Sequence, residues 1–459
     1  MAGNTSTISM QTFPVELISE VFWHCLYHPY NVRSVRPEAE VPVGYVTRSP
    51  SRAPLLLGRV CSSWRTIAIA TPELWSKISI GGYTSNITNK YRKDVIATQV
   101  WMNRAGMRPL SFHITDIGYP LDEYGLAAIQ QILDSVVSQS WRWKTIRATG
   151  PLDLMKKLFN PLKEGNIAKL ENFCSTSYGF DKVTLGFDSQ PFALSSSPRL
   201  KPLYVSGAPI CVDFGDQVHR IQLIDVYPTL HGTLSFGGVL QCLTQCPSLT
   251  KLVLGIRDSA QNVLPHSLPA VIELTNLHTL QLKLDRGIDP YFLFDRLFLP
   301  SLTKIDLSVF DCTKTDWPHL TKMLQRSRPP LAVLDVYVPM TEITLLECLS
   351  YIPEVTELVL GGIVCSDSTL TSLTIHETEG SSSEIVCPSL SSVAFDDSSH
   401  FSPEAMKAMI LSRCGDQAPE TIPGKALREV NCSYMLKDHI LLDPDIARCV
   451  KGGLTLAAW

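Results

Sequence analysis

Long apolar runs and the common catalytic motifs are both missing from this 459-residue sequence. A membrane-spanning helix needs about 18 or more consecutive apolar residues, and no such stretch is present. The first residues carry neither a basic segment nor an apolar segment, so we expect no secretory signal peptide. The patterns GxGxxG, Walker A, HExxH and GxSxG are absent as well, and the sequence therefore gives no support for an enzyme.

An excess of charge of one sign is also lacking. The chain has 44 acidic and 40 basic residues and a net charge of −4, which gives no reason to expect a nucleic-acid or membrane partner. The 13 cysteines form no CxxC pair, and several occupy apolar positions. This distribution favours free thiols in a reducing compartment, so we expect a cytoplasmic or nuclear protein.

Candidate metal ligands are few. His24 and His28 stand at positions i and i+4 of an expected helix, a spacing that zinc can use, but no third ligand is evident. Packing and surface roles are the favoured interpretation of both residues, and also of Cys242 and Cys246. We expect neither a metal nor another cofactor.

Two apolar segments near the N-terminus predict short helices. In Phe13–Leu26 the apolar residues recur at helical spacing, and Leu55–Ile80 carries a second such stripe that stops at Thr71 and Pro72. Helices this short and this apolar cannot bury every face on one another. Some of their surface is therefore expected to meet a partner.

These segments carry a resemblance to a known family. The phrases FPVELI, LGRVCSSWR and ATPELW, in this order, resemble the F-box of fungal F-box-like proteins with leucine-rich-repeat, ribonuclease-inhibitor-like tails. The resemblance implies a helical module that docks a Skp-type adaptor and, through it, a cullin. It assigns adaptor contacts to Pro14, Leu17, Ile18, Leu57, Val60, Cys61 and Trp64. The alternative is a helical cap on a repeat array that binds no adaptor.

The domain plan follows from these segments. Residues 10–80 are expected to form the F-box domain, and its proline-rich insertion at 29–54 is interpreted as a solvated surface loop. Residues 81–107 are interpreted as a linking helical region, with a helix over 90–106. Residues 108–459 are interpreted as a leucine-rich-repeat-like solenoid. The family resemblance extends to about residue 150.

A repeated LxxLxL unit fills the C-terminal half. Its successive first core positions lie 24 to 35 residues apart, which is the period of leucine-rich repeats. The clear first core positions are Leu249, Leu277, Leu302, Leu331, Val355 and Leu390. Fainter units are expected to begin at Leu110, Trp143, Leu170, Leu200 and Val218, and a last one at Leu427. Helices are expected between strands at 236–246, 291–298, 317–326, 343–351 and 403–414.

The repeat predicts an α/β fold, in which a short N-terminal helical module precedes an irregular arc of parallel strands with helices outside. Side chains alternate along each strand, so the residues between the core positions face the concave side of the sheet. A target is expected to meet that face at Lys251, Gln281, Lys283, Lys304, Asp306, Asp335, Tyr337 and Glu357.

Two function classes remain open at this stage. In the first, the protein is the substrate-recognition subunit of an SCF-type (Skp–cullin–F-box) ubiquitin ligase, holding an adaptor through its F-box and a target protein on its repeats. In the second, it is a repeat-protein binding scaffold outside any ligase. Neither class needs catalytic residues, and the sequence does not name the target.

Overall fold

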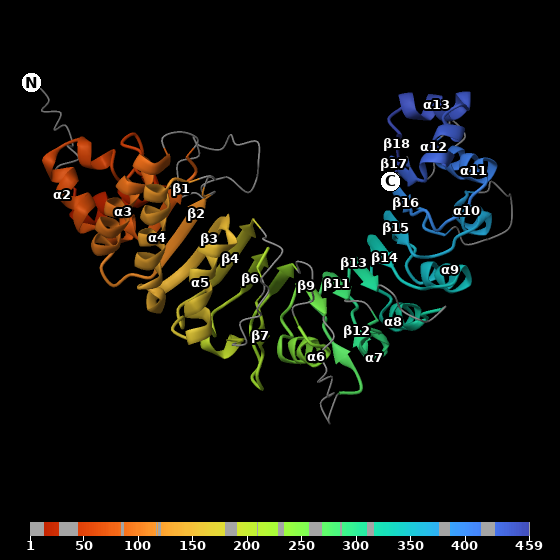
Figure 1. The fold of residues 1–459 in the computed structure, drawn as a ribbon, viewed down its shortest axis with the longest axis horizontal. Coiled ribbons are helices and arrows are strands. Elements are labelled where there is room, and N and C mark those ends of the chain that lie inside the picture. The colour runs from red at the N-terminus through yellow and green to blue at the C-terminus, as the bar shows by residue number, and fades with distance from the viewer. Residues whose placement is uncertain are drawn as a thin grey trace, which may run out of the picture. The chain divides into compact units, whose positions relative to one another are not determined.

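The structure is a computed structural model that describes residues 13–26, 45–83, 87–115, 117, 121–179, 191–208, 210–227, 234–256, 269–284, 287–309, 316–375, 386–414 and 427–458. The chain divides into two compact units, unit 1 (Met1–Gly215) and unit 2 (Asp216–Trp459). Each unit combines parallel strands with helices (Figure 1). The division falls inside the expected solenoid and not at its expected start.

Unit 1 begins with a helical module, defined here as residues 13–26 and 55–76. Its helices are α1 (Val15–Cys25), η3 (Leu57–Arg59), α2 (Ser62–Ala70) and η4 (Pro72–Trp75). Its sheet has the order β1-β2-β3-β4-β6. These strands are β1 (Lys77–Gly81), β2 (Leu110–Thr115), β3 (Trp143–Pro151), β4 (Asn172–Tyr178) and β6 (Pro202–Ser206). The helices between them are α3 (Ile87–Arg104), α4 (Glu123–Val137), η5 (Ser140–Arg142) and α5 (Leu152–Glu164). A separate parallel pair joins β5 (Phe192–Ala193) to β7 (Val212–Asp213), and η6 (Leu194–Ser196) follows β5.

The helical module has a small core of its own and a firm attachment to the sheet. Its buried apolar side chains are Ile18, Phe22, Leu57, Ile67, Ala68, Leu74 and Trp75. The thiol of Cys61 caps α2 by accepting a hydrogen bond from the Trp64 amide at 3.4 Å. The Trp75 indole donates to the Ala68 carbonyl at 2.8 Å, and the Arg104 guanidinium lies 4.4 Å from the centre of a Trp75 ring. The module is therefore joined to α3 through Trp75.

The sheet of unit 1 starts earlier than expected. Strand β1 pairs in parallel with β2, so the solenoid begins at Lys77 and not at residue 108. Helix α3 packs on β1 and lies beside α4, which makes it the helix of the first repeat and not a linker. The alternation in Lys77–Gly81 spans only five residues and directly follows the motif ATPELW, so the sequence alone does not separate this strand from the module.

The interpretation of the proline-rich insertion as a solvated loop is wrong at Val46 and Arg48, whereas residues 50–52 are exposed as expected. Val46 is fully buried and bridges Ile78, with its amide 2.8 Å from the Lys77 carbonyl. The Arg48 guanidinium ion-pairs with buried Asp94 and also donates to the Tyr83 hydroxyl at 3.0 Å. A buried strand-like bridge and a guanidinium held by α3 tie this stretch down despite its prolines. Residues 27–44 lie outside the described residues.

Unit 2 repeats one strand-and-helix unit. Its sheet has the order β8-β9-β11-β13-β14-β15-β16-β17-β18, and every paired register in it is parallel. The strands are β8 (Leu223–Tyr227), β9 (Lys251–Ile256), β11 (Thr279–Leu284), β13 (Lys304–Val309), β14 (Val333–Tyr337), β15 (Glu357–Gly361), β16 (Ser392–Phe395), β17 (Glu429–Cys432) and β18 (Thr455–Ala458). The helices are α6 (Phe236–Gln245), α7 (Tyr291–Phe294), α8 (His319–Ser327), α9 (Glu342–Ser350), α10 (Asp367–Leu373), α11 (Pro403–Cys414), α12 (Tyr434–Ile440) and α13 (Pro444–Lys451). Strands β10 (Ile272–Glu273) and β12 (Leu297–Phe298) form a separate short pair.

The expected core positions of the repeats are confirmed in unit 2. The fourth residue of each LxxLxL unit stands in one ladder across the sheet, and every member is at most 2% exposed. This ladder is Leu252, Leu280, Ile305, Leu334, Leu358, Val393 and Val430. The first core residues, Leu249 to Leu427, are buried as well. Burial of these two rows between the sheet and the helices is the main stabilising term of the unit.

Three expectations about unit 2 are wrong in detail. Val218 is 69% exposed, and the repeat begins instead at Ile221, which is 1% exposed. The helix expected over 291–298 ends at Phe294, because residues 297–298 form β12. A final strand, β18, follows β17 and was not expected.

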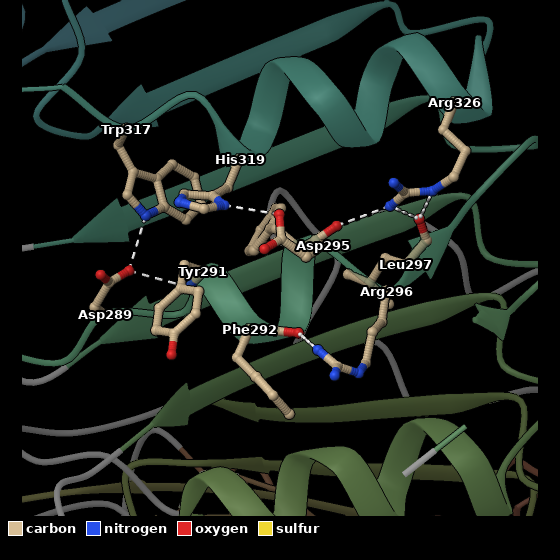
Figure 2. A network of polar contacts seen from close by, with 10 residues as sticks. Asp289, Tyr291, Phe292, Asp295, Arg296, Leu297, Trp317, His319 and Arg326 are labelled. Atoms are coloured by element: carbon tan, nitrogen blue, oxygen red, sulfur yellow. Dashed lines mark hydrogen bonds and ion pairs between the residues drawn. The ribbon is translucent and has the colours of Figure 1, made fainter. Parts of the chain in front are cut away.

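Neighbouring repeats are locked together by polar contacts on the helical side (Figure 2). The Arg326 guanidinium of α8 donates to the carbonyls of Phe294 at 2.9 Å and Leu297 at 2.6 Å, which α7 and β12 leave open. The Trp317 indole donates to the Asp289 carboxylate at 2.8 Å. Each contact joins residues about one repeat apart, so the network fixes the spacing of adjacent units.

Candidate binding surfaces

The helical module exposes large apolar side chains. Leu17 is 53% exposed and Val60 is 58% exposed, and both belong to the expected adaptor contacts. Pro14 is exposed too, whereas Cys61 and Trp64 are half-buried. The Trp64 ring packs on Phe22 with ring centres 4.9 Å apart, so part of it belongs to the module core. Exposed apolar groups of this size on so small a module are typical of a binding surface.

Two of the expected adaptor contacts lie inside the module. Ile18 is 4% exposed and Leu57 is 5% exposed, so neither side chain is available to a partner in this conformation. Sequence reasoning also missed several exposed apolar residues of the same module, which are Phe13, Val15, Val21, Leu56 and Ile69. Helical spacing could have identified two of them, because residues four apart lie on the same side of a helix. Val21 stands four residues after Leu17, and Leu56 stands four residues before Val60.

The open face of the unit 2 sheet, defined as the face away from the helices, holds all the expected target contacts. The register aligns them in three rows across the strands. Lys251, Lys304 and Glu357 stand in the first row, Gln281, Asp306 and Asp335 in the second, and Lys283 and Tyr337 in the third. Each is half-buried or exposed, while Val253 beside them is 2% exposed. The expected placement of this set on one face is confirmed.

A charged cluster occupies the middle of this face. Asp306 and Asp335 are direct neighbours on β13 and β14. Burial, and then the nearby Asp335 carboxylate, raise the pKa of Asp306 to about 6, against the lowering effect of Lys304 and Lys283. Burial also raises the pKa of Asp335. Two half-buried carboxylates on neighbouring strands repel each other when both are ionised. A cationic group of a partner would reduce that repulsion.

The charges of the open face are not all available to a partner. The Lys251 ammonium already contacts the Asp225 carboxylate at 2.6 Å, and Asp225 is 5% exposed. Lys304 is exposed and acts on the neighbouring carboxylates, and it forms no ion pair with any residue in the described part of the chain. Of the two lysines, Lys304 is therefore the better candidate for a contact with a target.

Tyr337 forms an aromatic shelf on the open face. A Cβ at Gly361 would lie 2.5 Å from the Tyr337 Cδ2 atom, so only glycine leaves room for the ring there. The next residue, Gly362, has a φ of +68° and donates its amide to the Asp396 carboxylate at 2.7 Å. The ring is thus seated over bare backbone and remains 41% exposed.

Among the described residues, no group of three or more His, Cys, Asp or Glu side chains could hold a metal ion. His24 is exposed and lies 3.3 Å from Glu20, while His28 lies outside the described residues. Within the part of the chain that the structure describes, no helix is both long and apolar enough to cross a membrane.

The sequence was also compared with models of protein families and with curated proteins, and neither comparison found a match.

Proposed function

We propose that this protein is the substrate-recognition subunit of an SCF-type ubiquitin ligase. The helical module would dock a Skp-type adaptor, and through it a cullin, while the open face of unit 2 would hold a target protein. The observation that carries the proposal is the exposure of Leu17 and Val60 on a module whose sequence resembles an F-box. In such an assembly, binding brings the target close to the ligase, so no catalytic residue is needed here.

Three further features support this proposal. The module has its own core, and its exposed apolar groups lie outside that core. The junction of Trp75 with Arg104 would hold adaptor and repeats in a fixed relation within unit 1. The open face of unit 2 offers paired carboxylates, lysines and an aromatic shelf, which suit recognition of a protein surface. A cytoplasmic or nuclear location would follow from the partners.

The test is adaptor binding by purified full-length protein. Leu17→Ala and Val60→Ala together are expected to weaken adaptor binding by about tenfold or more, because apolar anchors at such interfaces contribute about 1 kcal/mol or more each. Both residues are half exposed, so the double variant should keep its circular dichroism spectrum. Ile343→Ala on α9 is the matched control, since Ile343 is apolar and 81% exposed but lies outside the module.

Two outcomes would contradict the proposal. If the unaltered protein shows no adaptor binding at micromolar concentration, the ligase function fails and the scaffold outside any ligase takes its place. If the Ile343 variant loses as much affinity as the module variant, binding does not occur at the module.

A further inference from the structure

The face of the unit 1 sheet away from the helices, called its open face, is polar and free of carboxylates. Its residues on β1 and β2 are nearly buried, with Ser79, Ser111, His113 and Thr115 each at most 7% exposed, so the accessible part lies over β3, β4 and β6. The register places one row across its strands, made of Ser79, His113, Arg147, Cys174 and Tyr204. The flanking rows are Lys77, Ser111, Thr145 and Asn172 on one side, and Gly81, Thr115, Thr149, Thr176 and Ser206 on the other. None of these described strand residues is Asp or Glu, in contrast to the open face of unit 2.

Arg147 is the exposed cation of this row. Among the described residues, none forms a hydrogen bond or an ion pair with its guanidinium. Lys144, on the same strand, is instead occupied by Glu171 at 3.5 Å. A guanidinium carries five N–H donors, and those of Arg147 are directed to no acceptor in the described part of the chain.

The surroundings of Arg147 contribute hydrogen-bonding groups without adding charge. His113 is 5% exposed, and its Nδ1 atom is buried with no partner among the described residues. Burial, together with Arg147, lowers the pKa of His113 to about 4, so the imidazole is neutral at neutral pH. The Tyr45 ring covers it, with ring centres 5.8 Å apart. Arg147 is therefore the one guanidinium in the described rows of this face, and the other cation among them, Lys77, lies two strands away on β1.

A single guanidinium among neutral donors selects one kind of anion. Arginine pairs with a planar carboxylate through two parallel hydrogen bonds, and the match needs no second cation. A phosphoryl group carries nearly two negative charges and is typically held by a cluster of arginines, which the described strands of this face do not provide. The side chains next to Arg147 are short, as in Thr145 and Thr149, so a partner backbone can approach the sheet closely.

We propose that the open face of unit 1 binds an acidic segment of a partner protein, with Arg147 holding a Glu or Asp carboxylate of that segment through a bidentate ion pair. This site lies in the other unit from the proposed target surface and does not depend on adaptor binding. The assay below uses the full chain without an adaptor, so its failure and the failure of the ligase proposal can be told apart.

The experiment uses arrays of synthetic extended peptides with Glu, Gln or phosphoserine at the central position of an otherwise neutral background. Unaltered protein is expected to bind Glu peptides about tenfold or more tightly than the matched Gln peptides. Arg147→Gln should abolish this preference, and Arg147→Lys should retain only part of it because Lys lacks the planar fork. The matched control is Arg92→Gln, which removes one exposed charge from α3 in the same unit.

Three results would overturn the proposal. The first is equal binding of Glu and Gln peptides by the unaltered protein. The second is an equal loss in Arg92→Gln and Arg147→Gln, which would indicate attraction by overall charge. The third is binding of phosphoserine peptides alone, which would make the ligand a phosphoryl group. Because Arg147 is exposed, its variants should fold, and unchanged thermal melts would verify this.

Discussion

The attachment of residues 45–54 can be tested by removing one guanidinium. Arg48→Ala would leave Asp94, whose side chain is 2% exposed, with the Tyr83 hydroxyl at 2.7 Å as its remaining side-chain partner among the described residues. Removing one partner of a buried ion pair costs about 3 to 5 kcal/mol. The Arg48 side chain is 22% exposed, so the lower end of that range, about 3 kcal/mol, is expected here.

The loss should depend on pH in a defined direction. Burial raises the pKa of Asp94 above its ordinary value, even though Tyr83 and Arg48 act to lower it. Folded protein therefore binds this proton more tightly than the unfolded chain, and the associated stability is lost as the pH rises through the folded pKa. Without Arg48 that pKa rises further. The variant should thus lose most stability at about pH 8 and much less where Asp94 is protonated.

Hydrogen exchange of α3 and β1 amides is the suitable assay, because a chain with two compact units need not unfold in one step. Faster exchange is expected throughout α3 in Arg48→Ala at about pH 8, after correction for the intrinsic rate, with a smaller difference at acidic pH. Arg52→Ala is the matched control, since Arg52 is an exposed arginine of the same segment. Equal exchange in the two variants would refute the attachment and restore the solvated-loop interpretation.

Two further predictions concern the open face of unit 2. Asp306→Asn is expected to raise the melting temperature at about pH 8 but not near pH 4, because the stability that protonated Asp306 provides is lost as the pH rises through its pKa of about 6. Thermal melts over a pH series measure this, and a gain that persists at low pH would indicate a packing effect instead. Lys304→Glu is expected to weaken capture of a native target several-fold and to leave adaptor binding unchanged, with Lys322→Glu on α8 as the control. Equal losses in the two variants would place target binding elsewhere.

The repeat was predictable because one physical requirement recurs along the chain. Each unit must bury the same inward positions against its neighbours, so residues such as Leu252 and Leu334 repeat the LxxLxL spacing. The pattern leaves a three-residue ambiguity where two overlapping frames fit. Val218-x-x-Ile221-x-Leu223 and Ile221-x-x-Ile224-x-Val226 both match, and only the observed burial selects the second.

The remaining features depend on tertiary contacts that local patterns do not carry. Val46 is buried because it pairs with the edge strand β1. The proline-rich sequence around Val46 does not predict this pairing. Ile18 and Leu17 are adjacent apolar residues of α1, yet one faces the module core and the other faces outward. The free guanidinium of Arg147 could not be recognised before the register showed which side chains share its row.

The strands from β9 to β17 pair without a register shift, so their outward residues form straight rows. The spacing along such a row limits how an extended chain can bind across these strands. Neighbouring strands stand about 4.8 Å apart, whereas side chains on one side of an extended chain recur about every 6.8 Å. These two spacings differ, so side chains of the bound segment coincide with strands only about every 34 Å, or roughly every seven strands. A bound segment can therefore align fully with very few strands, so a small number of outward residues would govern selectivity while the rest vary freely.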